Sequence, residues 1–158
     1  MKKLLMLFLI LLPLAISSCG DDNDEPTPHT SKVPDETNIF NVNLGSSTSA
    51  GDFTIVLDNE YKFSCSRRRG GLISIVGPVN GIDNINLTAG QINSLPWTQY
   101  AVAQVGYGYI FVVSQWHNNY SPYYYDYYAV YVVSETGSTR KGYTLKVRKL
   151  LENVPPQN

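Results

Sequence analysis

The sequence is poor in the residues that usually ligate metals, with two cysteines and two histidines among 158 residues. His29 lies in a stretch rich in Pro, Thr and charge, which leaves His117 and Cys65 for the region that follows. A zinc site needs three or four ligands, and one histidine with one cysteine cannot supply them. No Gly-rich phosphate loop opening a helix is evident either. We therefore expect neither a bound metal nor a cofactor.

Arrangements of catalytic side chains are also lacking. A serine triad needs a base histidine that is oriented by a carboxylate and lies next to a nucleophile. His117 has Ser114, Ser121 and Asp126 near it in sequence, but nothing like a nucleophile elbow precedes either serine. Most carboxylates that could pair in glycoside cleavage fall at expected turns or strand ends. We therefore predict that the protein is not an enzyme, with a hydrolase as the weaker alternative.

Charge is scarce, since charged residues make up 16% of the chain and the formal net charge is −1. This balance gives no support to nucleic-acid binding. The densest basic group is Arg67, Arg68 and Arg69, directly before two glycines. These arginines fit a solvated turn best. The alternative is a site for an anionic polymer such as lipopolysaccharide or an acidic glycan.

The one long apolar run, residues 4–16, follows two lysines and is broken only by Pro13. It is shorter than the roughly 20 residues that cross a bilayer, so residues 1–18 have the layout of a secretory signal peptide. The quartet Ile16-Ser17-Ser18-Cys19 resembles the lipobox of bacterial lipoproteins. That resemblance implies cleavage before Cys19, acylation of its sulfur and amino group with chains such as palmitate, and anchorage in a membrane.

The residues after Cys19 are acidic and then rich in Pro and Thr. Asp21-Asp22-Asn23-Asp24-Glu25 resembles the export signal of Bacteroides-type lipoproteins, which implies the outer face of the outer membrane. A solvated acidic linker is the alternative, and it leaves the periplasmic face open. Because this composition cannot bury enough apolar surface to fold, residues 19–38 are predicted to be a flexible tether and residues 39–158 a single domain.

Two strands with apolar side chains on both faces dominate the predicted domain. Residues 109–113 and 127–133 alternate without a polar face, the pattern of strands that are covered on both sides. They are expected to pair antiparallel across a polar loop at 116–126. Further strands are predicted at 39–44, 53–57, 60–66, 72–76, 84–87 and 100–105. The strand predicted at 143–150 has one basic, solvent-exposed face and is expected at the outside or edge of a sheet. The prediction is an antiparallel β-sandwich, with a small β-barrel as the alternative.

Three segments between residues 61 and 150 resemble an uncharacterised domain family of small Bacteroides lipoproteins. They are Arg69-Gly70-Gly71-Leu72-Ile73-Ser74-Ile75, Gly106-Tyr107-Gly108-Tyr109 and Asp126-Tyr127-Tyr128-Ala129-Val130-Tyr131. The resemblance implies an envelope location and gives no catalytic residue. Where the family has a Pro-Gly-His turn, this chain has Gln104-Val105-Gly106, so a role of that histidine would be absent.

The main functional candidate is the aromatic loop, which contains Trp116, His117, Asn118, Asn119, Tyr120 and Tyr123. Rings with neighbouring amides and hydroxyls suit a sugar, whose apolar face stacks while its hydroxyls are hydrogen-bonded. Alternatively the tyrosines fill a core, above all at 124–128, and Trp97 is a second platform or a core cap. We predict a lipid-anchored envelope protein that binds a glycan or other polymer. The alternative is an accessory subunit of an outer-membrane protein complex.

Overall fold

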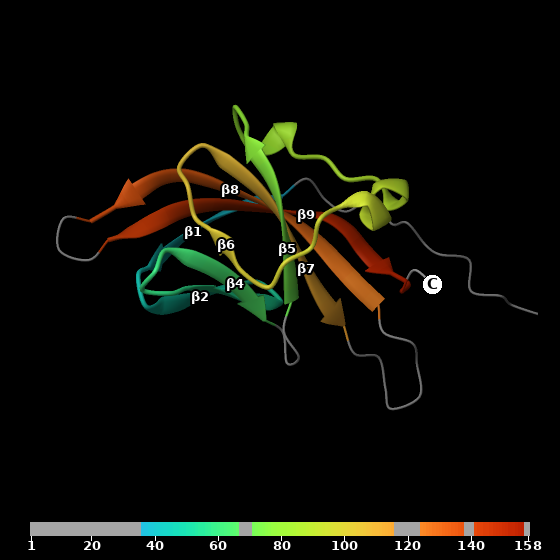
Figure 1. Ribbon diagram of the computed structural model, residues 1–158, viewed down its shortest axis with the longest axis horizontal. Helices are drawn as coiled ribbons and strands as arrows, with labels where there is room; N and C mark the ends of the chain where they lie inside the picture. Colours follow the sequence, from blue (N-terminus) through green and yellow to red (C-terminus); the bar gives the residue numbers. More distant parts are fainter. Residues whose placement is uncertain (1–35, 67–70, 116–123, 138–140, 157–158) are drawn as a thin grey trace, which may run out of the picture.

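The computed structural model describes residues 36–66, 71–115, 124–137 and 141–156, which form a sandwich of two antiparallel sheets (Figure 1). The larger sheet has the order β1-β9-β8-β7-β5. Its strands are β1 (Thr37–Asn43), β5 (Gly71–Pro78), β7 (Tyr107–Gln115), β8 (Tyr124–Thr136) and β9 (Gly142–Val154). The smaller sheet has the order β2-β3-β4-β6, with β2 (Ser46–Ala50), β3 (Phe53–Leu57), β4 (Lys62–Ser66) and β6 (Ala101–Val102). The predicted sandwich is confirmed, and the barrel alternative is wrong because the sheets do not close.

Aromatic side chains fill the space between the two sheets. The ring of Phe63, on β4, meets Tyr109, Phe111 and Tyr143 of the larger sheet at centroid distances of 5.6, 6.0 and 6.2 Å, each edge to face. Tyr109 and Phe111 share a face because side chains alternate along a strand. All four rings are buried, so this contact helps to hold the smaller sheet against the larger one.

The opposite face of the larger sheet is covered by residues 79–97, which contain two short 3₁₀ helices, η1 (Ile82–Asn84) and η2 (Ala89–Ser94). Ile82, Ile85 and Ile92 of this segment form a second buried cluster with side chains of β7 and β8. In Figure 1 the yellow-green segment lies on the side of the sheet away from β2 and β4. Both faces of the central strands are therefore covered, as their sequence pattern predicts. No helix in the described ranges is long and apolar enough to span a membrane.

The prediction that the last strand lies at an edge is wrong, because β9 pairs with β1 on one side and with β8 on the other. One of its basic side chains contacts the segment at 79–97. Arg148 Nη2 donates hydrogen bonds to the carbonyl oxygens of Ile85 at 3.0 Å and Ile82 at 3.4 Å. The positive charge therefore fastens the covering segment to the sheet.

Other differences lie in the connections. The expected two-residue turn at Asp58 and Asn59 is a four-residue turn, in which Asp58 Oδ1 accepts the N–H groups of Glu60 and Lys62, both at 2.8 Å. This bonding makes a local Asx-type turn and holds Tyr61 at a φ of 62°. No strand forms at 84–87, the strand at 100–105 shrinks to β6, and β1 begins at Thr37, two residues before the expected domain start.

The buried hydroxyl of Tyr109 gives a test of the core. It donates a hydrogen bond to the Val102 carbonyl at 2.7 Å and accepts one from the Gln104 N–H at 3.0 Å. Tyr109→Phe leaves both backbone groups without this partner, so the free energy of unfolding should fall by about 1–3 kcal/mol. Urea denaturation measures it. Tyr100→Phe, at an exposed ring, is the control and should change it by under about 0.5 kcal/mol; equal losses would contradict the assignment.

Candidate functional site

The site residues predicted from sequence lie outside the described residues. They are Cys19; Arg67, Arg68 and Arg69; and Trp116, His117, Asn118, Asn119, Tyr120 and Tyr123. The structure does describe the strand ends that flank the last two groups. Gly71, the first residue of β5, pairs with Val113, and Gln115, the last residue of β7, pairs with Tyr124. These strand ends therefore meet at one end of the sandwich.

A hollow of about 500 Å³ opens at this end. We call it the Tyr100 hollow, and its lining residues are Ser64, Cys65, Gly71, Leu72, Gln99, Tyr100, Val112, Ser114 and Tyr125. Its volume is that of an ordinary small-ligand pocket. The lining combines two tyrosine rings with hydroxyl and amide groups, and none of these described residues is charged.

Tyr100 is the most exposed ring of the hollow, with 57% of its surface open to solvent. Its backbone is positioned by Thr98, which lies two residues earlier. Thr98 exchanges backbone hydrogen bonds of 2.7 and 2.9 Å with Ile73 of β5, and Thr98 Oγ1 donates to the Tyr100 carbonyl at 3.1 Å. The ring is thus presented on a backbone that is already ordered, which reduces the entropy that a ligand must offset.

Cys65 lies beneath the hollow and is buried, as its alternation with Phe63 predicts. Burial raises the pKa of its thiol to about 12, so it stays protonated and is a poor nucleophile. The close packing here requires glycine at position 71. A Cβ at Gly71 would lie 2.4 Å from Cys65 Sγ and 2.6 Å from the Val112 carbonyl oxygen.

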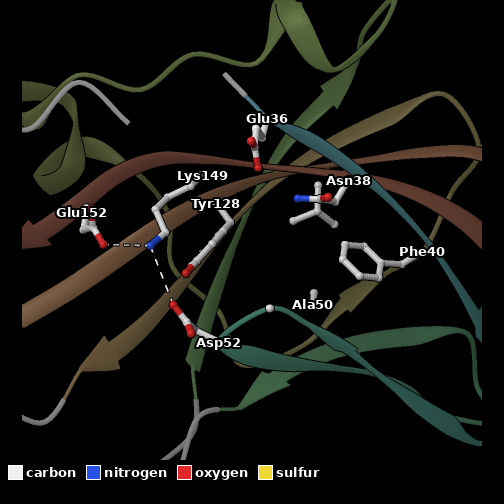
Figure 2. A pocket seen from close by; sticks show the side chains of 10 residues that line it. Glu36, Asn38, Phe40, Ala50, Asp52, Tyr128, Lys149 and Glu152 are labelled. Carbon is white, nitrogen blue, oxygen red and sulfur yellow. Dashed lines mark hydrogen bonds and ion pairs between the residues drawn. The ribbon is translucent and has the colours of Figure 1, made fainter. Parts of the chain in front are cut away.

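A second cavity, of about 360 Å³, lies at the edge of the sandwich where β1 faces the turn between β2 and β3. We call it the Lys149 pocket (Figure 2). Its lining residues are Glu36, Asn38, Phe40, Ala50, Gly51, Asp52, Tyr128, Val147, Lys149 and Glu152. Figure 2 shows Lys149 linked to Glu152 and Asp52, with the Tyr128 ring beside it and Phe40 across the open space. The pocket is therefore aromatic at its walls and charged at its rim.

Lys149 stands among carboxylates. Its Nζ lies 3.0 Å from Glu152 Oε1, 3.5 Å from Asp126 Oδ2 and 3.9 Å from Asp52 Oδ2. Burial lowers the pKa of Lys149, but the hydrogen bond to Glu152 and the nearby negative charges outweigh it and raise that pKa overall. Burial, with the charge of Asp126, raises the pKa of Tyr128 to about 12. Lys149 therefore stays charged and Tyr128 neutral at ordinary pH.

Asp126 is fully buried behind the Lys149 pocket. Its Oδ1 accepts the backbone N–H of Asn153 at 2.9 Å, and its Oδ2 accepts hydrogen bonds from Gln115 Nε2 and, at 3.5 Å, from the Tyr128 hydroxyl. Asn153 lies in a bulge of β9 with a φ of 52°, which places its N–H opposite the carboxylate. One side chain thus ties the ends of β7, β8 and β9 together.

No protein-family model, curated protein or solved structure matches this chain. Within the parts of the chain that the structure describes, no group of three or more His, Cys, Asp or Glu is placed to hold a metal ion.

Several aromatic and polar residues near the predicted site contribute to the core and not to an open surface. Tyr127 and Tyr128 are buried, which confirms the core interpretation for these two tyrosines. Trp97 is a core cap, because its ring lies 5.9 Å from that of Tyr127 and its Nε1 donates to the Ile92 carbonyl at 3.2 Å. Asp126 belongs to β8 and not to the loop at 116–126, and there it is a buried structural acceptor.

The Lys149 pocket was missed by sequence reasoning, although one pattern indicates it. Lys149 follows Leu145 and Val147 at the strand period of two, so it points inward at the end of an otherwise apolar face. An inward lysine needs carboxylate partners. The pattern does not say which ones, because Asp52 and Asp126 come from distant parts of the sequence.

Removal of the Asp126 carboxylate tests its role. Asp126→Ala leaves the Asn153 N–H and the Gln115 amide without their acceptor and takes one counter-charge from Lys149. We expect the free energy of unfolding to fall by about 3 kcal/mol. Chemical denaturation measures it, with Asp83→Ala, at an exposed position of η1, as the matched control. A loss no larger than that of the control would show that the carboxylate is not structural.

Proposed function

We propose that this protein is a lipid-anchored, non-enzymatic protein of the cell envelope that binds an uncharged segment of a glycan in the Tyr100 hollow. The observation that carries the proposal is the exposed Tyr100 ring, held beside a hollow whose described lining has hydroxyl and amide groups and no charged side chain. The aromatic loop predicted from sequence connects β7 to β8, whose paired ends lie beside the hollow. We propose this loop as a second contact region for the glycan.

The chemistry of the lining favours a neutral sugar. The apolar face of a pyranose stacks on an aromatic ring, and Tyr100 and Tyr125 offer two rings. Gln99, Ser64 and Ser114 offer amide and hydroxyl groups that donate to and accept from sugar hydroxyls. Among the described lining residues, an anionic or cationic ligand would find no opposite charge to offset the loss of its hydration.

The proposed location rests on the sequence. Cys19 would carry the acyl chains, and residues 19–35 would separate the domain from the membrane. The acidic run after Cys19 favours the outer face of the outer membrane, with the periplasmic face as the alternative.

A second candidate function is that of an accessory subunit in an envelope protein complex. Among the described residues, six of the seven exposed large apolar side chains lie on β5 or between residues 100 and 105: Leu72, Ile75, Val76, Tyr100, Val102 and Val105. β5 and β6 are edge strands of the two sheets. A protein partner that covered these side chains would remove apolar surface from water.

Tyr100→Ala tests the glycan proposal. We expect binding to neutral oligosaccharides on a glycan array to weaken about fivefold to tenfold, the scale of one lost stacking contact. Stability should change by no more than about 0.5 kcal/mol, since the ring is exposed. The control is Ile39→Ala, an exposed apolar residue on the opposite edge strand, which should leave binding unchanged.

Glycan binding by the wild type is measured first, because it distinguishes the two candidate functions. No glycan binding by the wild type would overturn the glycan proposal. Loss of a co-purifying envelope protein in Val76→Asp or Val102→Asp would then support the accessory subunit.

Cys19→Ser tests the anchor. Because residues 20–38 contain no apolar run, loss of the acylated sulfur should abolish incorporation of labelled palmitate and shift the protein out of the membrane fraction. Cys65→Ser is the matched control, since that buried thiol should play no part in acylation. Palmitate incorporation in the Cys19→Ser variant would rule out this site of lipidation.

A further inference from the structure

The Lys149 pocket is remote from the Tyr100 hollow. Strand β1, which lines the pocket, and strand β5, which lines the hollow, form the two opposite edges of the larger sheet. We propose that the Lys149 pocket is a second binding site, for a guanidinium or ammonium group carried on a short apolar stem. An arginine or lysine side chain and small organic amines share this chemistry. The proposal does not depend on the glycan proposal.

The shape of the pocket suits a stem with a charged end. Apolar surface comes from Ala50, Val147 and the rings of Phe40 and Tyr128, on four different strands. In Figure 2, Asn38 and Phe40 of β1 face Tyr128 and Asp52 across the open space. A volume of about 360 Å³ is enough for one such side chain or a small amine.

The charged side chains that line the pocket favour a positively charged ligand. Three of the described lining residues, Glu36, Asp52 and Glu152, are acidic, and Lys149 is the single basic one. Lys149 is already balanced by two closer partners, Glu152 at 3.0 Å and the buried Asp126 at 3.5 Å. An added anion would therefore meet a lysine whose charge is compensated, inside a rim of like charge.

Two carboxylates remain to receive a cation. Asp52 is 3.9 Å from Lys149 at its nearest, and 53% of its side chain is open to solvent. Glu36 is exposed and forms no ion pair with any described residue. A guanidinium can bind a carboxylate through two parallel hydrogen bonds, and Phe40 offers a ring face on which the cation can stack.

An organic cation fits better than a metal ion. Lys149 Nζ occupies the space between Glu152, Asp126 and Asp52, where a metal would have to sit. Hard metal ions such as Ca²⁺ take six to eight oxygen ligands, whereas this pocket offers rings and aliphatic groups over much of its wall. The apolar wall can stabilise only a ligand that has an apolar part to bury against it.

The test compares two ligands that differ in charge and have nearly the same shape. N-acetyl-arginine amide and N-acetyl-citrulline amide would be titrated into the full chain, and the backbone amide shifts of Ala50, Gly51 and Asp52 followed by NMR. We expect saturable shifts in the millimolar range with the arginine derivative, and binding at least about fivefold weaker with citrulline. Butylammonium as a third probe should also bind, and binding should weaken with added salt.

Variants assign the effect to the pocket. Asp52→Asn and Glu36→Gln should each weaken arginine-amide binding about fivefold, while Asp83→Asn, an exposed carboxylate on η1, should not. Both altered side chains are exposed, so folding should be retained, and the amide spectrum of each variant checks this. Equal binding of the arginine and citrulline derivatives, shifts that do not saturate, or an equal effect of Asp83→Asn would each overturn the proposal.

Discussion

The structure depends on a constraint set by β7 and β8, whose side chains are apolar on both faces. A sheet with such strands at its centre must be covered twice. One cover is the smaller sheet, which contributes Phe63 to the aromatic core. The other is the irregular segment 79–97, held by three buried isoleucines and by Arg148. Because both faces are used for packing, the hollow and the pocket lie at the margins of the larger sheet.

The two margins differ because different side chains end the strands there. Near the start of β5, the described lining of the hollow contains serine, glutamine and tyrosine beside apolar residues, and none of these described residues is charged. At β1 and the end of β9 it presents carboxylates around Lys149, supported from behind by Asp126. The bulge at Asn153 is part of this support, since it supplies a backbone donor to a buried carboxylate. The described residues at the two margins therefore differ in charge, which is the reason why a different ligand is proposed for each.

The parts of the fold that follow from local pattern were predictable, and those set by distant pairing were not. The antiparallel pairing of β7 with β8 and the burial of Cys65 follow from the period of two along a strand. The interior position of β9 does not, because its neighbour β1 lies about a hundred residues earlier in the chain. Likewise, the Lys149 pocket joins residues 36–52 to residues 128–152, and nothing in either segment alone identifies the other.

The contact at Gly71 has a consequence for how this sequence can drift over evolutionary time. Shortening Cys65 would relieve only the 2.4 Å approach to its sulfur, while the Val112 carbonyl oxygen would still lie 2.6 Å from a new Cβ. That carbonyl is backbone of β7 at the place where β7 pairs with β5, so it cannot retreat without opening the ladder. Position 65 is therefore free to change among small residues, while position 71 stays glycine in every descendant that keeps this sheet.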